Sequence, residues 1–455
     1  MARATTDIRG HGKFAGGIHP DEAKALSADM PIRAFPAPKK VALPVLQHVG
    51  AACKPIEGMD KPKKKVSLGD VVADSEAFVS APIHASISGT TAMASVTTLP
   101  NGRHVRTIVI NAGEEDQLVG EAVIEDVLGG EWPTEGLDRF SAEQITSAVR
   151  AGGIVGLGGA AFPTHVKLTR NEAKPIDTLL VNGCECEPYL TSDYRLMLER
   201  PGPVISGALL AGRAVGAESV IVVVEDNKPM AVEALQRAAR GTGIQIVSVH
   251  TKYPMGGEKQ TVLAVLDRVV PTGGLPLDVG VVVVNVGTSA AIARAVLRGK
   301  GLTHRAISVT GAGIVHPRNL LAPLGVSYGE LIEHCGGLTD SAARIVAGGP
   351  MMGFALADLD TPVTKGTSGV VALTWDDLQA AEETHCIRCG ACVDVCPVKL
   401  VPTKIALAAR HKDWELARKY HMAACMECGC CAYTCPAQIP LVQLIRMGKV
   451  QMARE

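Results

Sequence analysis

Residues 386–397 read CIRCGACVDVCP, and residues 425–436 read CMECGCCAYTCP. Both stretches follow the pattern Cys-x2-Cys-x2-Cys-x3-Cys-Pro, and each position of the second lies 39 residues after its counterpart, as position 425 follows 386. Three thiolates at this spacing can surround one cubane cluster, while the fourth, next to proline, binds the cluster of the other copy. The repeat therefore predicts two [4Fe–4S] clusters.

The exchange of the fourth cysteine divides the eight ligands into two sets. The first cysteine set is Cys386, Cys389, Cys392 and Cys435. The second cysteine set is Cys425, Cys428, Cys431 and Cys396. Zinc is the alternative occupant, but its four ligands usually come as two Cys-x2-Cys pairs, which leaves the full repeat unexplained. Cys430 lies outside the pattern and is interpreted as a packed thiol.

The overall composition narrows the class of protein. Nine of the 13 cysteines lie between residues 386 and 435, whereas a disulfide framework spreads its cysteines through a small secreted chain. Lys and Arg number 45 against 46 Asp and Glu, and only 3% of the residues are aromatic. This composition argues against a nucleic-acid partner, which requires a basic excess or stacking platforms. The 455 residues suffice for about three domains.

Upstream of the cysteines, apolar runs alternate with amphipathic stretches. The expected strands of this part are 178–182, 220–225 and 279–285. The expected helices are 203–216, 230–240 and 289–299, with a further helix that begins at the N-cap Ser141. The alternation predicts a parallel α/β sheet. Short β-branched stretches within 36–110 predict a separate β domain, and residues 303–356 predict a small α+β module.

A glycine-rich stretch precedes the first of these strands, and residues 152–168 read GGIVGLGGAAFPTHVKL. Glycines leave backbone N–H groups accessible, and together with Lys167 these groups can form a cradle for a phosphate. The stretch follows an expected helix rather than a strand, which fits a dinucleotide-binding loop poorly. The next strand ends in NGCECEPY at residues 182–189, so acidic side chains lie where parallel sheets bind ligands. Cys184 and Cys186 lack partners at metal spacing and are interpreted as packed.

Taken together, these motifs resemble the RnfC family, the C subunits of Rnf electron-transport complexes. The resemblance covers nearly the whole chain and includes the glycine-rich stretch, the acidic stretch and the cysteine repeat. It also includes the segments 16–20, 45–50, 80–89, 271–276, 285–288 and 348–353. The central part is similar to the flavin-carrying subunit of respiratory complex I.

The resemblance implies that FMN binds non-covalently and that NAD(H) is a substrate. The residues that it implies around these groups are Gly156, Gly158, Gly159, Lys167, Asn182, Glu185, Glu187, Tyr253, Glu258, Asn285 and Thr288. The glycines and the lysine would surround the phosphate or ribityl chain. Asn182 and Glu185 would face the flavin, and Glu187 would lie near the nicotinamide. Leu157 and Gly257 depart from the complex I pattern at the nucleotide pocket, where the relative has Arg and Glu.

The resemblance also implies a multidomain α/β and α+β architecture of four units. The expected units are 1–115, a barrel-sandwich hybrid like those of biotinyl and lipoyl carriers; 116–264, a Rossmann-like FMN- and NADH-binding α/β domain; 265–374, a β-grasp module of the soluble-ligand-binding (SLBB) type; and 375–455, a helical ferredoxin-like domain with both clusters. The tip of the first unit, Ser88-Gly89-Thr90, offers no lysine for a carrier modification. We therefore expect this unit to serve in docking.

The implied activity is electron exchange between NAD(H) and ferredoxin, coupled to ion translocation by partner subunits. No side chain is expected to act as a catalytic acid or base, because the cofactors carry the redox chemistry. No signal peptide or membrane span is predicted, so the expected position is peripheral, on the cytoplasmic side of the cell membrane. Expected partners are membrane and cytoplasmic Rnf subunits, including another iron–sulfur subunit, and ferredoxin.

Two alternatives remain beside this interpretation. A soluble corrin (cobalamin) reductase related to RnfC would use the same cofactors, but its glycine-rich domain comes near the start of the chain, whereas here a β domain precedes it. An electron carrier or scaffold with clusters but without flavin is the other alternative. The glycine-rich and acidic stretches distinguish it, because a flavin-free module does not need them.

Overall fold

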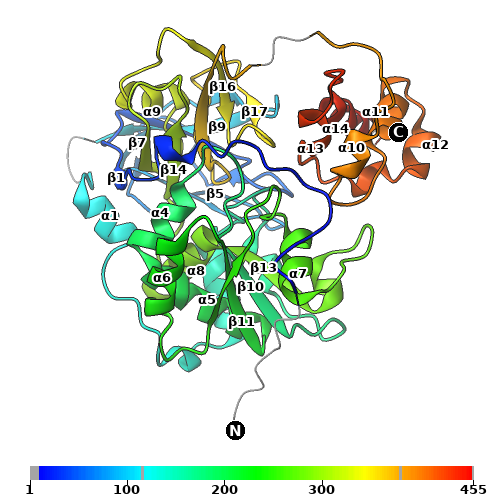
Figure 1. The fold of residues 1–455 in the computed structure, drawn as a ribbon. Helices are drawn as coiled ribbons and strands as arrows, with labels where there is room; N and C mark the ends of the chain where they lie inside the picture. The colour runs from blue at the N-terminus through cyan, green and yellow to red at the C-terminus, as the bar shows by residue number, and fades with distance from the viewer. Residues whose placement is uncertain (1–9, 114–116, 379–381, 453–455) are drawn as a thin grey trace.

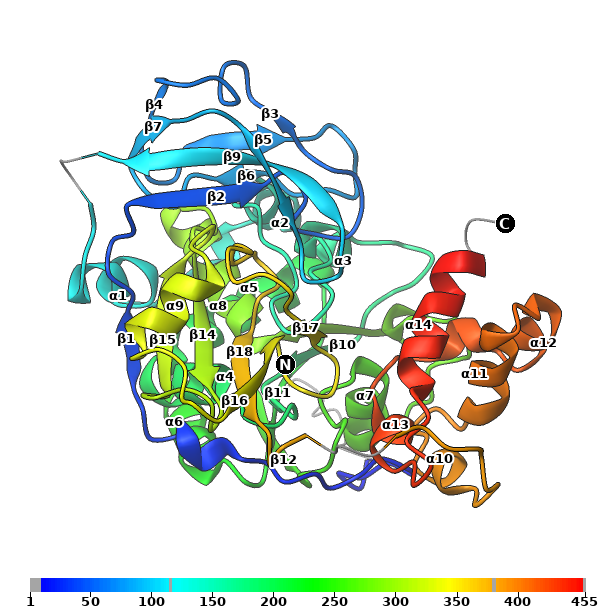
Figure 2. The same ribbon diagram turned by 90° about the horizontal axis from the view of Figure 1, so that it is seen from above.

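The computed structural model describes residues 10–113, 117–378 and 382–452. Within these residues there are four β-sheets, of six, five, four and three strands, together with a C-terminal group of helices. Figure 1 shows the four-stranded sheet with its helices below, and the C-terminal helices set to one side. The view from above shows the small sheets of the N-terminal half stacked over the rest (Figure 2).

The four-stranded sheet is parallel throughout, as the sequence predicts. Its strands, in spatial order, are β12 (Gln245–Val249), β11 (Ser219–Glu225), β10 (Thr178–Asn182) and β13 (Val281–Asn285). Side chains alternate between two faces along a strand. Leu179 packs with helices α5 (Pro201–Val215) and α8 (Val286–Arg298) on one face, whereas Leu180 packs with α7 (Glu258–Leu266) on the other. All four strands therefore end at one common edge.

Short helices connect and flank this sheet. They are α1 (Glu121–Val127), α2 (Ala142–Ala151), α3 (Thr164–Leu168), α4 (Ser192–Glu199) and α6 (Pro229–Ala238). The predicted N-cap Ser141 is confirmed: its hydroxyl accepts a hydrogen bond from Gln144 N, and the Gln144 side chain accepts one from Ser141 N. This reciprocal capping satisfies two of the free N–H groups at the start of α2.

The expected boundary between residues 264 and 265 is wrong, because it cuts through this sheet. Strand β13 pairs with β10 over its whole length, from Val281 beside Thr178 to Asn285 beside Asn182. Helix α8 continues directly from β13 and packs against α5. The α/β unit therefore extends to the end of α8 at Arg298.

The N-terminal β domain consists of two antiparallel sheets. One contains β2 (Lys40–Pro44), β9 (His104–Ala112), β7 (Gly89–Thr91), β4 (Lys65–Val66) and β8 (Ser95–Thr98). The other contains β3 (Lys54–Pro55), β5 (Val71–Asp74) and β6 (Ile83–His84). At the predicted tip, a Cβ atom on Gly89 would lie 1.9 Å from the Asn111 carbonyl oxygen, so the close approach of β7 to β9 requires glycine.

The six-stranded sheet combines distant parts of the chain. Its strands, in spatial order, are β1 (Ile32–Ala34), β15 (Arg318–Pro323), β14 (His304–Thr310), β18 (Gly369–Thr374), β16 (Ala342–Ala347) and β17 (Phe354–Ala355), and helix α9 (Tyr328–His334) follows β15. Strand β1 runs parallel to β15. Residues 32–34 of the expected first unit, 1–115, therefore pair with the six-stranded sheet rather than with the two sheets of the β domain.

The C-terminal unit is helical, as predicted, and has its own core. Its helices are α10 (Ala391–Asp394), α11 (Pro402–Arg410), α12 (Trp414–Lys419), α13 (Cys430–Tyr433) and α14 (Leu441–Met452). Helices α11 and α14 pack together through a core that includes Ile405, Met422 and Ile445. Figure 2 places this unit beside α7 and away from the β domain. Among the helices of the described residues, none combines the length and apolar character needed to cross a membrane.

The β domain offers a direct test of its core. Leu43 on β2 is fully buried, whereas Val96 on β8 is 64% exposed. We expect Leu43→Ala to lower the free energy of unfolding by about 2–5 kcal/mol, because the substitution leaves a cavity. Val96→Ala should change it by less than about 0.5 kcal/mol. Urea unfolding followed by circular dichroism measures both, and equal stability of the two variants would contradict the assigned core.

Candidate flavin and iron–sulfur sites

Three of the predicted cofactor residues meet at the carboxyl edge of the parallel sheet. Asn182 ends β10 and Asn285 ends β13, and the two are paired in register. The Asn285 side chain caps α8, because its oxygen accepts hydrogen bonds from Gly287 N at 2.8 Å and Thr288 N at 3.2 Å. Asn182 holds the neighbouring loop by donating to the Gly256 carbonyl at 2.8 Å. This is the edge where open α/β sheets bind their ligands.

The glycine-rich stretch forms a loop over the same edge, between α2 and α3. Leu157 N donates to Thr288 Oγ1 at 2.8 Å, which fixes the loop to the first turn of α8. A Cβ atom on Gly158 would lie 2.8 Å from Asn285 Nδ2, so the loop contacts the strand end directly. A Cβ atom on Gly159 would meet no atom within 4 Å. The loop therefore presents open space on the side of Gly159, where a ligand can approach the backbone.

Lys167 and Glu258 flank this edge as an ion pair. Lys167 lies on α3, and its Nζ is 2.5 Å from Oε1 of Glu258, the first residue of α7. Nζ also donates to the Val283 carbonyl at 3.3 Å. Both side chains are partly exposed. An anionic ligand at the glycine-rich loop would therefore compete with Glu258 for the lysine.

Both acidic residues of the 182–189 stretch accept hydrogen bonds from backbone N–H groups elsewhere in the chain. The Glu185 carboxylate accepts from Asp193 N at 2.6 Å and from Tyr194 N at 3.1 Å, at the start of α4. The Glu187 carboxylate accepts from the N–H groups of residues 351 and 352, at 3.1 and 2.9 Å. Burial raises the pKa of each carboxyl to about 7. Their roles toward flavin and nicotinamide stay predictions.

Lys24, which sequence reasoning did not identify, supports this acidic stretch. Its Nζ donates to the carbonyl oxygens of Glu185, Glu187 and Leu190, at 2.9, 2.9 and 2.6 Å. Burial lowers the pKa of Lys24. The lysine comes from the N-terminal segment, 161 residues before Glu185 in the sequence. No local sequence pattern links two positions so far apart.

The predicted flavin residue Tyr253 connects the α/β unit with the cysteine loops. Its hydroxyl donates to the Cys428 carbonyl at 2.7 Å. Tyr253, Ile18, Cys428 and Cys430 form a buried apolar cluster. Partly buried neighbours complete it, namely Cys186, Met351, Val395 and Met426. Cys186 and Cys430, interpreted as packed from the sequence, therefore pack at this one contact.

The two cysteine motifs have the same local backbone conformation. Arg388 and Glu427, 39 residues apart, both have positive φ, 57° and 59°, and each N–H lies 3.4 Å from the sulfur of the motif's first cysteine. The glycines at 390 and 429 follow with φ of 84° and 85°. The sequence repeat is therefore also a structural repeat.

The second cysteine set lines one cavity. Cys396, Cys425, Cys428 and Cys431 surround an empty space of about 350 Å³, part of which is open solvent. Among the described residues, no three side chains of His, Cys, Asp or Glu converge closely enough to hold a single metal ion. The four predicted ligands of the second set therefore line the same space.

The first cysteine set lies nearer the surface. Cys386 and Cys389 are exposed, and Cys392 and Cys435 are partly buried. Cys392 Sγ lies 2.9 Å from Thr403 Oγ1 on α11. The two sets therefore differ in solvent contact, with the second set against the α/β unit and the first set facing outward.

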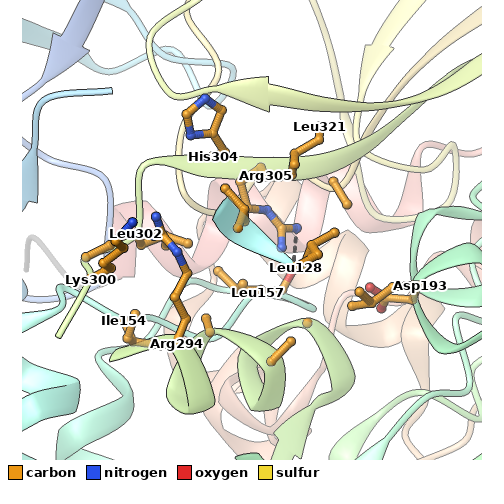
Figure 3. A pocket seen from close by; sticks show the side chains of 17 residues that line it. Leu128, Ile154, Leu157, Asp193, Arg294, Lys300, Leu302, His304, Arg305 and Leu321 are labelled. Atoms are coloured by element: carbon orange, nitrogen blue, oxygen red, sulfur yellow. Dashed lines mark hydrogen bonds between the residues drawn. The ribbon is translucent and has the colours of Figure 1, made fainter. Parts of the chain in front are cut away.

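A further cavity of about 550 Å³, including open solvent, lies behind the glycine-rich loop (Figure 3). Leu157 of the loop, Arg305 of β14 and Asp193 of α4 line it, together with Arg294 and Lys300. Sequence reasoning missed Asp193 and Arg305. The available signal was the charged residue Arg305 within the predicted α+β module, which a local pattern cannot connect to a loop 148 residues away.

Family models match four consecutive parts of the chain. The RnfC barrel sandwich hybrid domain matches residues 12–115, and the Nuo51 FMN-binding domain matches residues 149–294. The SLBB domain matches residues 307–355, and the 4Fe-4S dicluster domain matches residues 385–439. These matches confirm the predicted kinds of domain and their FMN and [4Fe–4S] cofactors.

Three relatives resemble the chain over nearly its full length. One relative is the C subunit of the proton-translocating ferredoxin:NAD⁺ oxidoreductase complex of Clostridium ljungdahlii. It is 42% identical, and the match covers 95% of this chain and 92% of the relative. The C subunit of the Na⁺-translocating complex of Acetobacterium woodii is 41% identical, with coverages of 96% and 97%. The C subunit of the ion-translocating oxidoreductase complex of Rhodobacter capsulatus is 40% identical, with coverages of 96% and 83%.

The sheet edge, the glycine-rich loop and the cysteine repeat define a flavin- and iron–sulfur-containing electron-transfer protein. Within this class, the chain belongs to the RnfC family, the C subunits of ion-translocating ferredoxin:NAD⁺ oxidoreductase complexes. The resemblance inferred from the sequence is thereby confirmed.

The raised pKa of Glu187 makes a prediction about pH. Burial raises the pKa of this carboxyl from 4.5 to about 7 in the folded chain. Because the folded chain binds the proton more tightly, the stabilising effect is complete below pH 4.5 and is lost as pH rises through 7. We expect Glu187→Gln to flatten the fall in melting temperature between pH 5 and pH 8. Differential scanning fluorimetry across this range measures it, with Glu143→Gln at an exposed helix start as the control. An unchanged pH profile in the Glu187 variant would contradict the assignment.

Proposed function

We propose that the protein exchanges electrons between NAD(H) and ferredoxin, as the flavin- and cluster-bearing subunit of an ion-translocating complex. The observation that carries this proposal is the buried contact between the two cofactor regions. Tyr253 follows the sheet edge of the predicted flavin site, and its hydroxyl binds the backbone of Cys428 in the second cysteine set. A flavin region and a cluster region held together in this way suit electron transfer between them.

The chemistry that FMN supplies when bound is the conversion between a hydride pair and single electrons, which an iron–sulfur cluster alone cannot perform. The chain's residues bind and orient. We propose that the amides of the glycine-rich loop and Lys167 hold the phosphate or ribityl chain, since both border the same edge. Asn182, Asn285 and Thr288 fix the loops around the cofactor. No side chain is assigned as a catalytic acid or base.

The acidic residues are proposed to orient the nicotinamide and to influence the flavin. Glu185 and Glu187 are each held by two backbone N–H groups, so their carboxylates have defined directions. Glu258 is held by Lys167. Raised pKa values of about 7 at Glu185 and Glu187 leave part of their population neutral near neutral pH, which reduces repulsion of an anionic nucleotide.

We further propose that the eight motif cysteines bind two [4Fe–4S] clusters in the two sets defined by the sequence repeat. The shared cavity supports the second set, including its exchanged member Cys396 from the first motif. The burial of this set against Tyr253 supports a position between the flavin site and the first set. The first set, with Cys386 and Cys389 exposed, then faces the redox partner.

The relatives' names describe complexes that translocate protons or Na⁺. For this chain we propose membrane and cytoplasmic partner subunits, including another iron–sulfur subunit, with ferredoxin as a redox partner. A peripheral position on the cytoplasmic side of the cell membrane agrees with NAD(H) as a substrate. The corrin-reductase alternative is disfavoured because the RnfC barrel domain precedes the flavin domain, and the flavin-free alternative because an FMN-binding domain is matched.

The first test is cofactor content and NADH oxidation. Anaerobically purified protein should contain one FMN and about eight irons per chain, and NADH should bleach the flavin absorbance. Lys167→Ala and Glu185→Ala should each lower NADH–ferricyanide activity about 10-fold or more, because each removes a charged hydrogen-bonding group at the site. Lys174→Ala removes an ion pair with Asp278 outside the proposed site and serves as the control. Absence of flavin reduction by NADH in the parent protein would refute the proposed function.

The second test concerns the order of the clusters. Cys389→Ala should remove the cluster of the first set while NADH still reduces the remaining cluster. Cys425→Ala should remove the cluster of the second set, and the remaining cluster should then stay oxidised during the first turnover. Freeze-quench EPR measures both, in samples whose flavin is bleached by NADH. The opposite pattern, or equal reduction in both variants, would refute the proposed order.

A further inference from the structure

An arginine of the six-stranded sheet holds the glycine-rich loop from behind. Arg305 is the second residue of β14 and is 4% exposed. Its Nη2 donates to the Leu157 carbonyl at 2.9 Å, the hydrogen bond drawn as a dashed line in Figure 3. Its Nε donates to the Thr367 carbonyl at 3.0 Å, which fixes the plane of the guanidinium. Burial lowers the pKa of Arg305 to about 10, so the group stays charged at neutral pH.

The other polar group of Leu157 is held from the opposite direction. Leu157 N donates to Thr288 Oγ1 at 2.8 Å, in the first turn of α8. Both the N–H and the C=O of one loop residue are therefore bound to side chains of different elements. The residues that follow are Gly158, which abuts Asn285, and Gly159, which borders open space. With Leu157 held on both sides, the amides of these glycines have a fixed direction.

We propose that Arg305 is a positioning residue for the flavin. Through the Leu157 carbonyl it sets the conformation of the glycine-rich loop, so that the amides of Gly158 and Gly159 face the bound FMN. This inference rests on the flavin site proposed above. A guanidinium donates from a rigid planar fork, so its two bonds, from Nε to Thr367 and from Nη2 to Leu157, fix the orientation of the whole group, whereas the donors of an ammonium group rotate freely about the Cε–Nζ bond.

The same cavity contains a matched control. Arg294 lies on α8, lines the cavity with Arg305 and is 6% exposed. Its guanidinium binds Asp126 Oδ2 at 2.7 Å and also contacts the Gly301 carbonyl. None of its hydrogen bonds within the described chain reaches the glycine-rich loop. Removing Arg294 therefore disturbs the same cavity and removes the same type of buried cation, but leaves the hydrogen bonds of Leu157 to Arg305 and Thr288 intact.

The test measures the dissociation constant of FMN for the full-length apoprotein, by titration of flavin fluorescence. We expect Arg305→Met to weaken FMN binding about 10-fold or more, since a charge-assisted hydrogen bond to the loop is lost. Arg294→Met should bind FMN within about 2-fold of the parent, although both substitutions lower the melting temperature. Visible circular dichroism of the bound flavin should change in the Arg305 variant and stay the same in the Arg294 variant.

Arg305→Lys keeps the charge but lacks the planar guanidinium with its two donating nitrogens. We expect its FMN affinity to lie between those of the parent and Arg305→Met. This variant also provides the test if Arg305→Met does not fold. Equal weakening in the Arg305 and Arg294 variants, or unchanged affinity in the Arg305 variants, would overturn the proposal. A parent apoprotein that binds no FMN would overturn the flavin site itself, a result that differs from equal affinities of parent and variant.

Discussion

This architecture depends on keeping the flavin region and the cluster region close together. The hydrogen bond from Tyr253 to the Cys428 backbone holds the two regions in contact. A hydrogen bond at 2.7 Å inside an apolar cluster is protected from competition with water. The helical unit has its own core and is joined to the rest partly through this cluster.

Buried Lys and Arg side chains that bind backbone carbonyls join the α/β unit to the N-terminal segment, the β domain and the six-stranded sheet. Lys24 binds three carbonyls of the acidic stretch, and Arg305 binds the glycine-rich loop. Lys365 is fully buried and binds the carbonyls of Pro82 in the β domain and Gly153 before the loop. Each carbonyl replaces a hydrogen bond that water would make to the buried nitrogen. Hydrogen bonds from a buried Lys or Arg side chain to backbone carbonyls therefore recur at three interfaces.

The sequence predicted the local features well, because they depend on neighbouring residues. The apolar runs indicated the parallel sheet, and the repeated cysteine spacing corresponds to two loops that share one backbone conformation. The resemblance implied Asn182 and Asn285 around the flavin, and the structure places both at the end of paired parallel strands. The clamp by Arg305 and the role of Lys24 were not predictable, because each joins residues more than 140 positions apart. Strand β1, with only three residues, carries no periodic signal, so its pairing with β15 was not predictable.

That pairing has a consequence for biosynthesis. Strand β1 pairs with β15, in which Ile32 lies beside Asn319, so residues 32–34 cannot join the six-stranded sheet until most of the chain has left the ribosome. Translation at 5–20 residues per second imposes a delay of roughly 15–60 s between synthesis of β1 and of β15. The six-stranded sheet, whose last strand in the sequence is β18, is therefore completed late in synthesis.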